Sequence, residues 1–162
     1  MNMKLNINLL FLLMLLSSLF ASGCQKQYIP NTEIPDNTFN RDVINFCERY
    51  RHAVEDLNVA ILMNLTSPRY FDNSGTTTGD DDVDKQHLEE ILGERFKAID
   101  EIRFEIKYRS VFEDNDFIIV QYIYTMSFQY TIDGDTKWYN HTGDKRLKLE
   151  RDGDDFLILS GM

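Results

Sequence analysis

The chain has 162 residues, with 17 Lys and Arg against 27 Asp and Glu, which gives a formal net charge of −10. This acidic balance argues against a nucleic-acid groove, because phosphate binding needs clustered cations. Hydrophobic residues make up 43% of the chain and aromatic residues 12%, which argues against wholesale disorder and a coiled coil. We therefore expect one globular domain.

Residues 1–23 have the pattern of a secretory signal peptide. One cation, Lys4, precedes an uncharged apolar run from Leu9 to Leu16, and small residues follow as far as Gly23. This run is shorter than the ~20 apolar residues that a membrane-spanning helix needs. The sequence therefore predicts a cleaved signal rather than a permanent transmembrane anchor.

The end of this segment, Ala21-Ser22-Gly23-Cys24, resembles the lipobox of bacterial lipoproteins, with Ala21 in place of the usual Leu. The resemblance implies that Cys24 is lipidated and becomes the mature N-terminus, so that acyl chains hold the protein on a bilayer. Gln25 stands where Asp would favour inner-membrane retention, so we expect the outer membrane of a Gram-negative bacterium. A Gram-positive surface, or an ordinary secretory signal with a coincidental cysteine, is the alternative.

Residues 24–38 hold two of the three prolines and show no sustained hydrophobic period, which predicts a lipidated cysteine followed by an extended tether. A single domain is expected over 39–162. It begins with a helix from Phe39, for which Thr38 or Asn40 is the expected N-cap. The apolar stripe of this helix is formed by Val43, Phe46, Cys47, Tyr50, Ala53, Val54, Leu57 and Ile61.

The remaining pattern predicts two further helices and four strands. The helices are expected over 58–65 and 83–99, with a turn-rich segment between them. After residue 100 the hydrophobic period changes from helical to two. Strands separated by turn sequences are expected over 102–109, 117–132, 137–151 and 156–159. We expect these strands to form an antiparallel meander, which makes the fold class α+β.

This order of elements, together with the terminal segment FLILSGM over 156–162, resembles the nuclear transport factor 2-like superfamily across about 39–162. The resemblance implies N-terminal helices on a curved antiparallel sheet of four or more strands, the α+β cone of SnoaL-like and cystatin-like proteins. Another helix-on-sheet lipoprotein domain is the alternative. The superfamily includes isomerases, dehydratases and cyclases as well as non-catalytic binding domains, so the fold does not select a function.

Familiar catalytic and metal-binding patterns are missing from the sequence. The acidic run over 80–84 lacks the Gly and Glu spacing of an EF-hand, and the three histidines lie far apart. No nucleophile elbow, phosphate loop or dinucleotide fingerprint occurs. We therefore predict no metal and no cofactor. With Cys24 consumed by lipid, Cys47 has no partner and is expected to be a buried, unreactive thiol.

Aromatic residues of equal parity on neighbouring strands are the best candidates for a ligand site. The concave face of the implied cone meets the helices, so these side chains would line its open end. We expect the lining to include Tyr50, Tyr108, Tyr122 and Tyr124, joined by Trp138 or His141 from the strand over 137–151. A packed aromatic core is the alternative interpretation of the same stripe. An isomerase of this fold also needs a carboxylate base inside the cone, and strand acids such as Glu105 alternate to the other face.

These observations favour a membrane-anchored envelope lipoprotein with a non-catalytic domain. The expected partners are the lipid bilayer, through acylated Cys24, and a small apolar ligand or an envelope protein. A homodimer is compatible with the pattern. The alternative function is a small-molecule isomerase, dehydratase or cyclase of the nuclear transport factor 2-like type.

Overall fold

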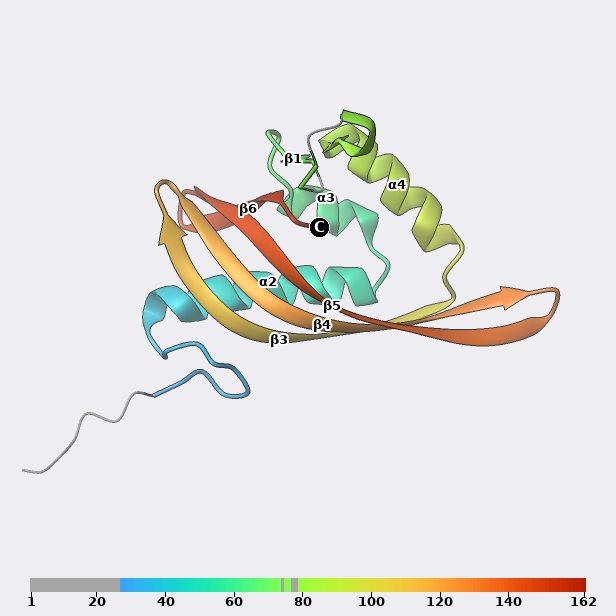
Figure 1. Cartoon of the computed structure of the whole chain (residues 1–162), viewed down its shortest axis with the longest axis horizontal. Helices are drawn as coiled ribbons and strands as arrows, with labels where there is room; N and C mark the ends of the chain where they lie inside the picture. Colours follow the sequence, from blue (N-terminus) through green and yellow to red (C-terminus); the bar gives the residue numbers. More distant parts are fainter. Residues whose placement is uncertain (1–26, 74, 77–78) are drawn as a thin grey trace, which may run out of the picture.

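The computed structural model describes residues 27–73, 75–76 and 79–162, and it shows helices packed on the concave side of a curved antiparallel sheet (Figure 1). The predicted signal peptide and Cys24 lie outside the described residues. Among the helices of the described ranges, none is both long and apolar enough to cross a membrane.

The segment before the first helix is folded against the domain. Ile34 is fully buried in the core. Tyr28 forms an antiparallel bridge with Pro35, and the Glu33 N–H donates to the Tyr108 carbonyl at 3.4 Å. The expectation of an extended tether over 24–38 therefore needs a correction for residues 27–37, because the sequence analysis did not weigh one isolated isoleucine between prolines as a core residue.

The first two helices confirm the predicted pair. α2 covers Thr38–Glu55, and Asn37 caps it by accepting a backbone hydrogen bond, one residue before the first expected cap. α3 covers Val59–Leu65 and is capped by Asn58. Leu57 adopts a positive φ of 51°, which separates the two helices.

The third predicted helix is α4, which covers Lys85–Lys97. Its N-cap is Asp84, whose carboxylate accepts the His87 N–H at 2.8 Å. Three short elements in the turn-rich segment precede it: β1 (Phe71–Asp72), the 3-10 turn η2 (Gly79–Asp81) and β2 (Val83–Asp84). β1 and β2 pair as a two-stranded ribbon, which the sequence analysis did not predict.

The main sheet consists of β3 (Glu101–Asp114), β4 (Phe117–Ile132), β5 (Asp135–Asp152) and β6 (Asp155–Ser160). The strands pair antiparallel in the order β3-β4-β5-β6, which confirms the predicted meander. β5 pairs with β4 along almost its whole length but with β6 only from Lys148 onwards. The β4–β5 hairpin therefore extends beyond β6 and the helices (Figure 1).

Tight turns set the register of this sheet. Asp133 and Gly134 connect β4 to β5, and both have positive φ, 53° and 86°. This backbone conformation is the one that a two-residue hairpin turn needs to match the right-handed twist of its two strands. The turn sequence that separates the two expected strands therefore also fixes which side chains of β4 and β5 face each other.

The packed core lies at the end of the sheet that includes β6 and that α2 and α3 cover. Its most deeply buried side chains have at most 1% exposure: Ile34, Val43, Phe46, Cys47, Leu62, Ile118, Val120, Leu147, Leu149 and Ile158. Cys47 is thus a buried free thiol, as expected, and burial raises the pKa of that thiol, so it stays protonated and unreactive.

Candidate functional site

A cavity of about 610 Å³, partly open to solvent, lies at the other end of the sheet, between the helices and the concave face of β3, β4 and β5. The residues that line it are predominantly apolar and aromatic. They are Tyr50, Val54, Leu62, Leu92, Arg95, Phe96, Ile99, Ile102, Phe104, Tyr122, Tyr124, Met126, Phe128, Tyr130, Tyr139, Asn140, His141, Lys145 and Met162. This size and composition are typical of small-molecule sites.

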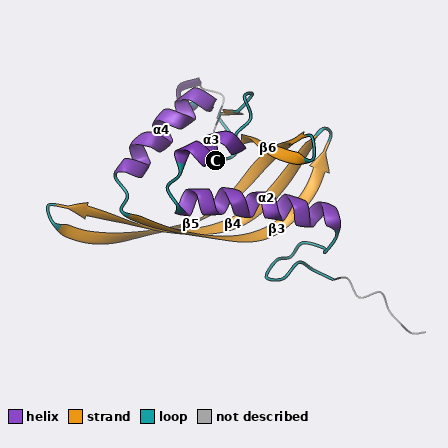
Figure 2. Cartoon of the chain, turned by 180° about the vertical axis from the view of Figure 1, so that it is seen from behind, coloured by secondary structure: helices purple, strands orange, loops and turns teal. Residues whose placement is uncertain are grey.

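The cavity exists because α4 does not pack directly on the sheet. α2 lies along the sheet, whereas α4 contacts α3 and β2 (Figures 1 and 2). The burial of the β4 side chains on the concave face decreases along the strand towards the cavity. Val120 and Tyr122 on the concave face are buried, while Tyr124, Met126 and Phe128 further along that face are only half-buried.

Two groups of ring contacts line the concave face at the cavity, one around Tyr124 and one around Phe128. Tyr124 lies 5.9 Å from Phe104 and 5.6 Å from His141, measured between ring centroids. Phe128 stacks on Tyr139 at 5.9 Å with an interplanar angle of 17°. Because neighbouring rings support one another, the cavity wall is held by aromatic contacts even where it borders space.

Gly143 makes room for the Tyr124 ring. The two residues are cross-strand partners, and a Cβ at Gly143 would lie only 3.1–3.3 Å from three atoms of that ring. Any other residue would therefore push Tyr124 away from the sheet. The glycine sets how far the ring stands in the cavity.

Two buried phenols form the inner wall. Tyr50 from α2 is 6% exposed and Tyr122 from β4 is 2% exposed, and each hydroxyl affects the pKa of the other. Burial raises the pKa of both hydroxyls. Both groups therefore stay neutral at physiological pH, and they present weakly polar surface deep in the cavity.

The charged groups of the lining are cationic. Arg95 from α4 and Lys145 from β5 line the cavity, and Asn140 and His141 add neutral or titratable polar atoms. No Asp or Glu occurs among the described residues that line it. The arrangement can hold an apolar molecule and can offer positive charge to one part of it, but it supplies no carboxylate base.

Four of the six residues expected from the sequence line this cavity: Tyr50, Tyr122, Tyr124 and His141. Tyr108 faces the same side but lies in the packed core, 3% exposed, where its hydroxyl donates to Glu48 Oε1 at 2.8 Å. The expectation that Tyr108 lines the site is therefore corrected. Burial raises the pKa of this phenol.

The expectation that Trp138 lines the cavity is also wrong. It pairs with Gln129, whereas its neighbour Tyr139 pairs with Phe128 on the concave face. Trp138 is therefore on the convex face, where Arg103 lies 4.7 Å from the ring centroid. Trp138 and His141 have opposite parity on β5, so their side chains point to opposite faces of the strand.

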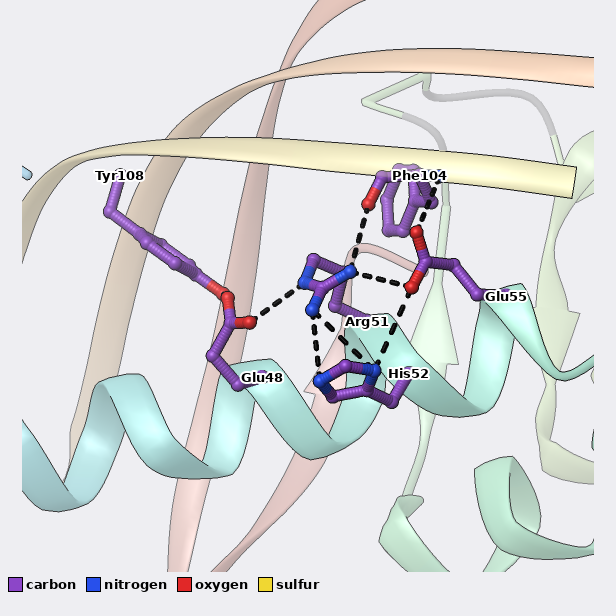
Figure 3. Close-up of polar contacts among 6 residues, drawn as sticks. All are labelled: Glu48, Arg51, His52, Glu55, Phe104 and Tyr108. Carbon is purple, nitrogen blue, oxygen red and sulfur yellow. Dashed lines mark hydrogen bonds and ion pairs between the residues drawn. The ribbon is translucent and has the colours of Figure 1, made fainter. Parts of the chain in front are cut away.

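A polar network fastens α2 to the edge strand β3 (Figure 3), and its charged side chains, Glu48, Arg51 and Glu55, are outside the cavity lining. Arg51 forms ion pairs with Glu48 at 2.7 Å and with Glu55 at 2.6 Å. Glu55 Oε1 accepts the Phe104 N–H at 3.1 Å, so a side chain of α2 satisfies a backbone donor at the sheet edge. The network fixes the helix that carries Tyr50.

The α4 side of the site was missed by sequence reasoning. Leu92 and Phe96 lie on an apolar stripe of the helix predicted over 83–99, but such a stripe does not show whether it meets a packed core or a cavity. Arg95, three residues after Leu92, was the available signal, because it places a cation beside that stripe.

The acidic run before α4 has a local role. Asp84 caps the helix, and Asp81 accepts a hydrogen bond from the Thr76 hydroxyl at 2.6 Å. Within the part of the chain that the structure describes, no group of three or more His, Cys, Asp or Glu side chains could hold a metal ion.

No protein-family model matches the sequence, and no curated protein matches it. Solved structures do match. A nuclear transport factor 2-like superfamily protein from Salmonella enterica superimposes with a TM-score of 0.59 at 13% identity, over 76% of this chain and 91% of that one. The chain has the nuclear transport factor 2-like fold.

Two further solved structures illustrate how widely this fold is used. A candidate dehydratase of the same family from Streptomyces avermitilis matches with a TM-score of 0.60 at 12% identity, over 76% of this chain and 93% of that one. A candidate calcium/calmodulin-dependent protein kinase II association domain from Xanthomonas campestris gives 0.61 at 18% identity, over 85% and 91%. At such identities the likeness establishes the fold alone.

Proposed function

We propose that this protein is a lipid-anchored envelope protein whose domain binds a small apolar molecule in the cavity between α4 and the sheet. The cavity itself is the observation that carries the proposal. About 610 Å³ of space is lined by aromatic and aliphatic side chains on this part of the sheet, whereas the other end of the sheet has a close-packed core. Filling it with an apolar body would remove that lining from water and stabilise the complex.

Membrane attachment is proposed from the sequence pattern Ala21-Ser22-Gly23-Cys24. The folded segment begins by Tyr28, which pairs with Pro35. Few residues would therefore separate the lipidated cysteine from the body, and at ~3.3–3.6 Å per residue they span at most roughly 14 Å. We expect the domain to sit close to the outer-membrane surface.

Mass spectrometry of the membrane fraction tests the anchor. An N-terminal peptide that begins at acylated Cys24 is expected, and Cys24→Ala should release or misprocess the protein while leaving the domain folded. Recovery of a soluble protein with a different N-terminus would remove this part of the proposal.

The cavity is tested with a neutral apolar probe, N-phenylnaphthylamine, whose fluorescence rises in apolar surroundings. Met126 lines the cavity, whereas its neighbour Thr125 pairs with Thr142 and faces the opposite side of β4. Met126→Trp should place a bulky indole inside the cavity and block probe binding. Thr125→Trp is the matched control, since it places the same indole on the other face of β4.

Saturable binding by the wild type and by Thr125→Trp, with none by Met126→Trp, is the expected result. Thermal denaturation of each variant checks that all three proteins are folded. Equal binding by the two tryptophan variants, or no saturable binding by any of them, would overturn the proposed function.

An isomerase, dehydratase or cyclase is the second candidate, and His141 is the observation that favours it. This residue lines the cavity beside Tyr124, and imidazole is the commonest general base in enzymes. Turnover of small carbonyl or hydroxy compounds by the wild type, and its loss in His141→Ala, would favour this candidate.

Cross-linking in intact envelopes separately tests for a protein partner or a second copy of this chain.

A further inference from the structure

We propose that the molecule bound in the cavity carries an anionic group, such as a carboxylate, which Arg95 and Lys145 hold while the aromatic wall holds its apolar body. This inference rests on the proposed function, because it names the ligand class of the same cavity. It concerns the chemistry of one end of the ligand rather than whether the cavity is occupied.

The first argument is the sign of the charge in the lining. The whole chain has an excess of acids, 27 against 17 basic residues. The cavity reverses this balance, since Arg95 and Lys145 line it and none of its described lining residues is Asp or Glu. A cationic concavity in an acidic protein concentrates positive potential where a ligand enters.

The second argument is that neither cation is neutralised within the described part of the chain. Most arginines there form ion pairs with carboxylates: Arg41, Arg49, Arg51, Arg69, Arg103, Arg109 and Arg151. Arg95 and Lys145 have no carboxylate within ion-pair distance in those ranges. Their charges are available to a bound molecule.

Local geometry keeps the neighbouring acids away from both cations. Asp144 precedes Lys145 on β5, so its side chain is on the opposite face of the strand. The positions three and four residues from Arg95 are Ile91 and Leu92 on α4 and Ala98 and Ile99 just after it, none of which is acidic. The sequence around each cation thus leaves the cavity side without a competing carboxylate.

The third argument is the placement of the two cations on different elements. Arg95 lies in the last turn of α4, and Lys145 lies on β5, whose concave side forms another wall of the cavity. Apolar residues of both elements, such as Leu92 and Tyr139, belong to the same lining. This pattern fits an amphipathic anion and does not fit a neutral hydrocarbon, which would gain nothing from the cations.

The test compares N-phenylnaphthylamine with its sulfonated counterpart, anilinonaphthalene sulfonate, which adds one negative charge to nearly the same aromatic body. We expect the wild-type protein to bind the sulfonate about tenfold more tightly at low salt, a difference of about 1.4 kcal/mol. The preference should shrink as salt is added, because exposed charge pairs are screened.

The decisive variant is Arg95→Met/Lys145→Met. It should lose the tenfold preference for the sulfonate and retain the affinity for the neutral probe. Lys97→Met/Lys137→Met is the matched control, because it removes the same charge from exposed residues outside the cavity lining. Near-ultraviolet circular dichroism of both variants excludes the nonspecific sulfonate binding that loosely folded states show.

Each outcome separates this inference from the proposed function. Equal binding of the two probes by the wild type would overturn the proposal of an anionic ligand and leave the proposed apolar site intact. An equal loss of the preference for the sulfonate in both double variants would do the same. No binding of either probe would overturn the proposed function itself.

Discussion

The two ends of the concave face share β3, β4 and β5 and differ in what covers them. At one end β6 joins the sheet and α2 and α3 cover it (Figure 2), and Val120, Leu147 and Leu149 are completely buried. At the other end α4 stands away from β4 and β5, and Phe128 and Tyr130 remain half-buried beside a cavity. An apolar strand face therefore does not by itself predict a packed core.

The two ends also differ in how much their side chains contribute to the stability of the fold. Burial at the packed end contributes most of the free energy of folding, because close-packed side chains lose both transfer free energy and contacts when they are removed. At the hollow end the side chains already border space, so they can be changed with a small cost in stability. The hollow end is thus where binding residues can vary.

The largest expected effect compares one substitution at the two ends. Phe46→Ala removes a ring that is 1% exposed and packs edge-on against Phe156, so it should lower the free energy of unfolding by about 3–5 kcal/mol. Phe128→Ala at the cavity should cost only about 1 kcal/mol, because its ring is half-buried. Urea denaturation measures both. Equal losses would show that the second end is packed as well.

Gly161→Ala tests how closely the C-terminal segment packs against β5. Gly161 has a φ of 98°, and an added Cβ would lie 2.0 Å from the Arg146 carbonyl oxygen. The strain and displacement should cost about 1–3 kcal/mol. Gly93→Ala in α4 is the control: no neighbouring atom lies within 4 Å of its Cβ position, so alanine should leave stability unchanged or raise it. A tolerated Gly161→Ala would contradict the close approach.

A smaller loss is expected from Tyr108→Phe. The variant removes the hydrogen bond that the buried hydroxyl donates to Glu48, which should cost about 1 kcal/mol in chemical denaturation. Probe binding should not change, because Tyr108 is outside the cavity lining. A change in probe affinity with unaltered stability would place Tyr108 at the hollow end after all.

The smallest effect on stability is expected from Gly143→Ala. The new methyl group would displace the Tyr124 ring by a few tenths of an ångström, and that ring has cavity space to move into. We expect a change below about 0.5 kcal/mol in unfolding free energy. The affinity for N-phenylnaphthylamine should fall measurably. Stability loss without any change in affinity would mean that Tyr124 belongs to a packed core.

The sequence predicted the elements of this fold well because each carries a local signal. Alternating apolar residues and turns such as Asp133-Gly134 specify the strands and their order. The short ribbon of β1 and β2 was missed because two-residue strands have no period. Ile34 was missed because its segment is held against β3, far along the chain, where the Glu33 N–H donates to the Tyr108 carbonyl.

The candidate site was only partly predictable for a related reason. Parity along β4 placed Tyr122 and Tyr124 correctly on one face, and the helical stripe added Tyr50. Trp138 was misplaced because the sequence analysis did not fix which parity of β5 faces the helices. Lys145 carries no local signal and Arg95 only its place beside the apolar residues of α4, because the distance between α4 and the sheet is set by tertiary packing rather than by local sequence.

Methionine methyl groups provide the most direct test of the central claim that the hollow end binds a ligand. Of the six methionines, Met126 and Met162 line the cavity, while Met63 is buried in α3 outside the lining. Nuclear magnetic resonance of isotope-labelled methyl groups during titration with N-phenylnaphthylamine should shift the Met126 and Met162 signals and leave that of Met63 in place. A titration that shifts Met63 alone, or none of the three, would contradict this account.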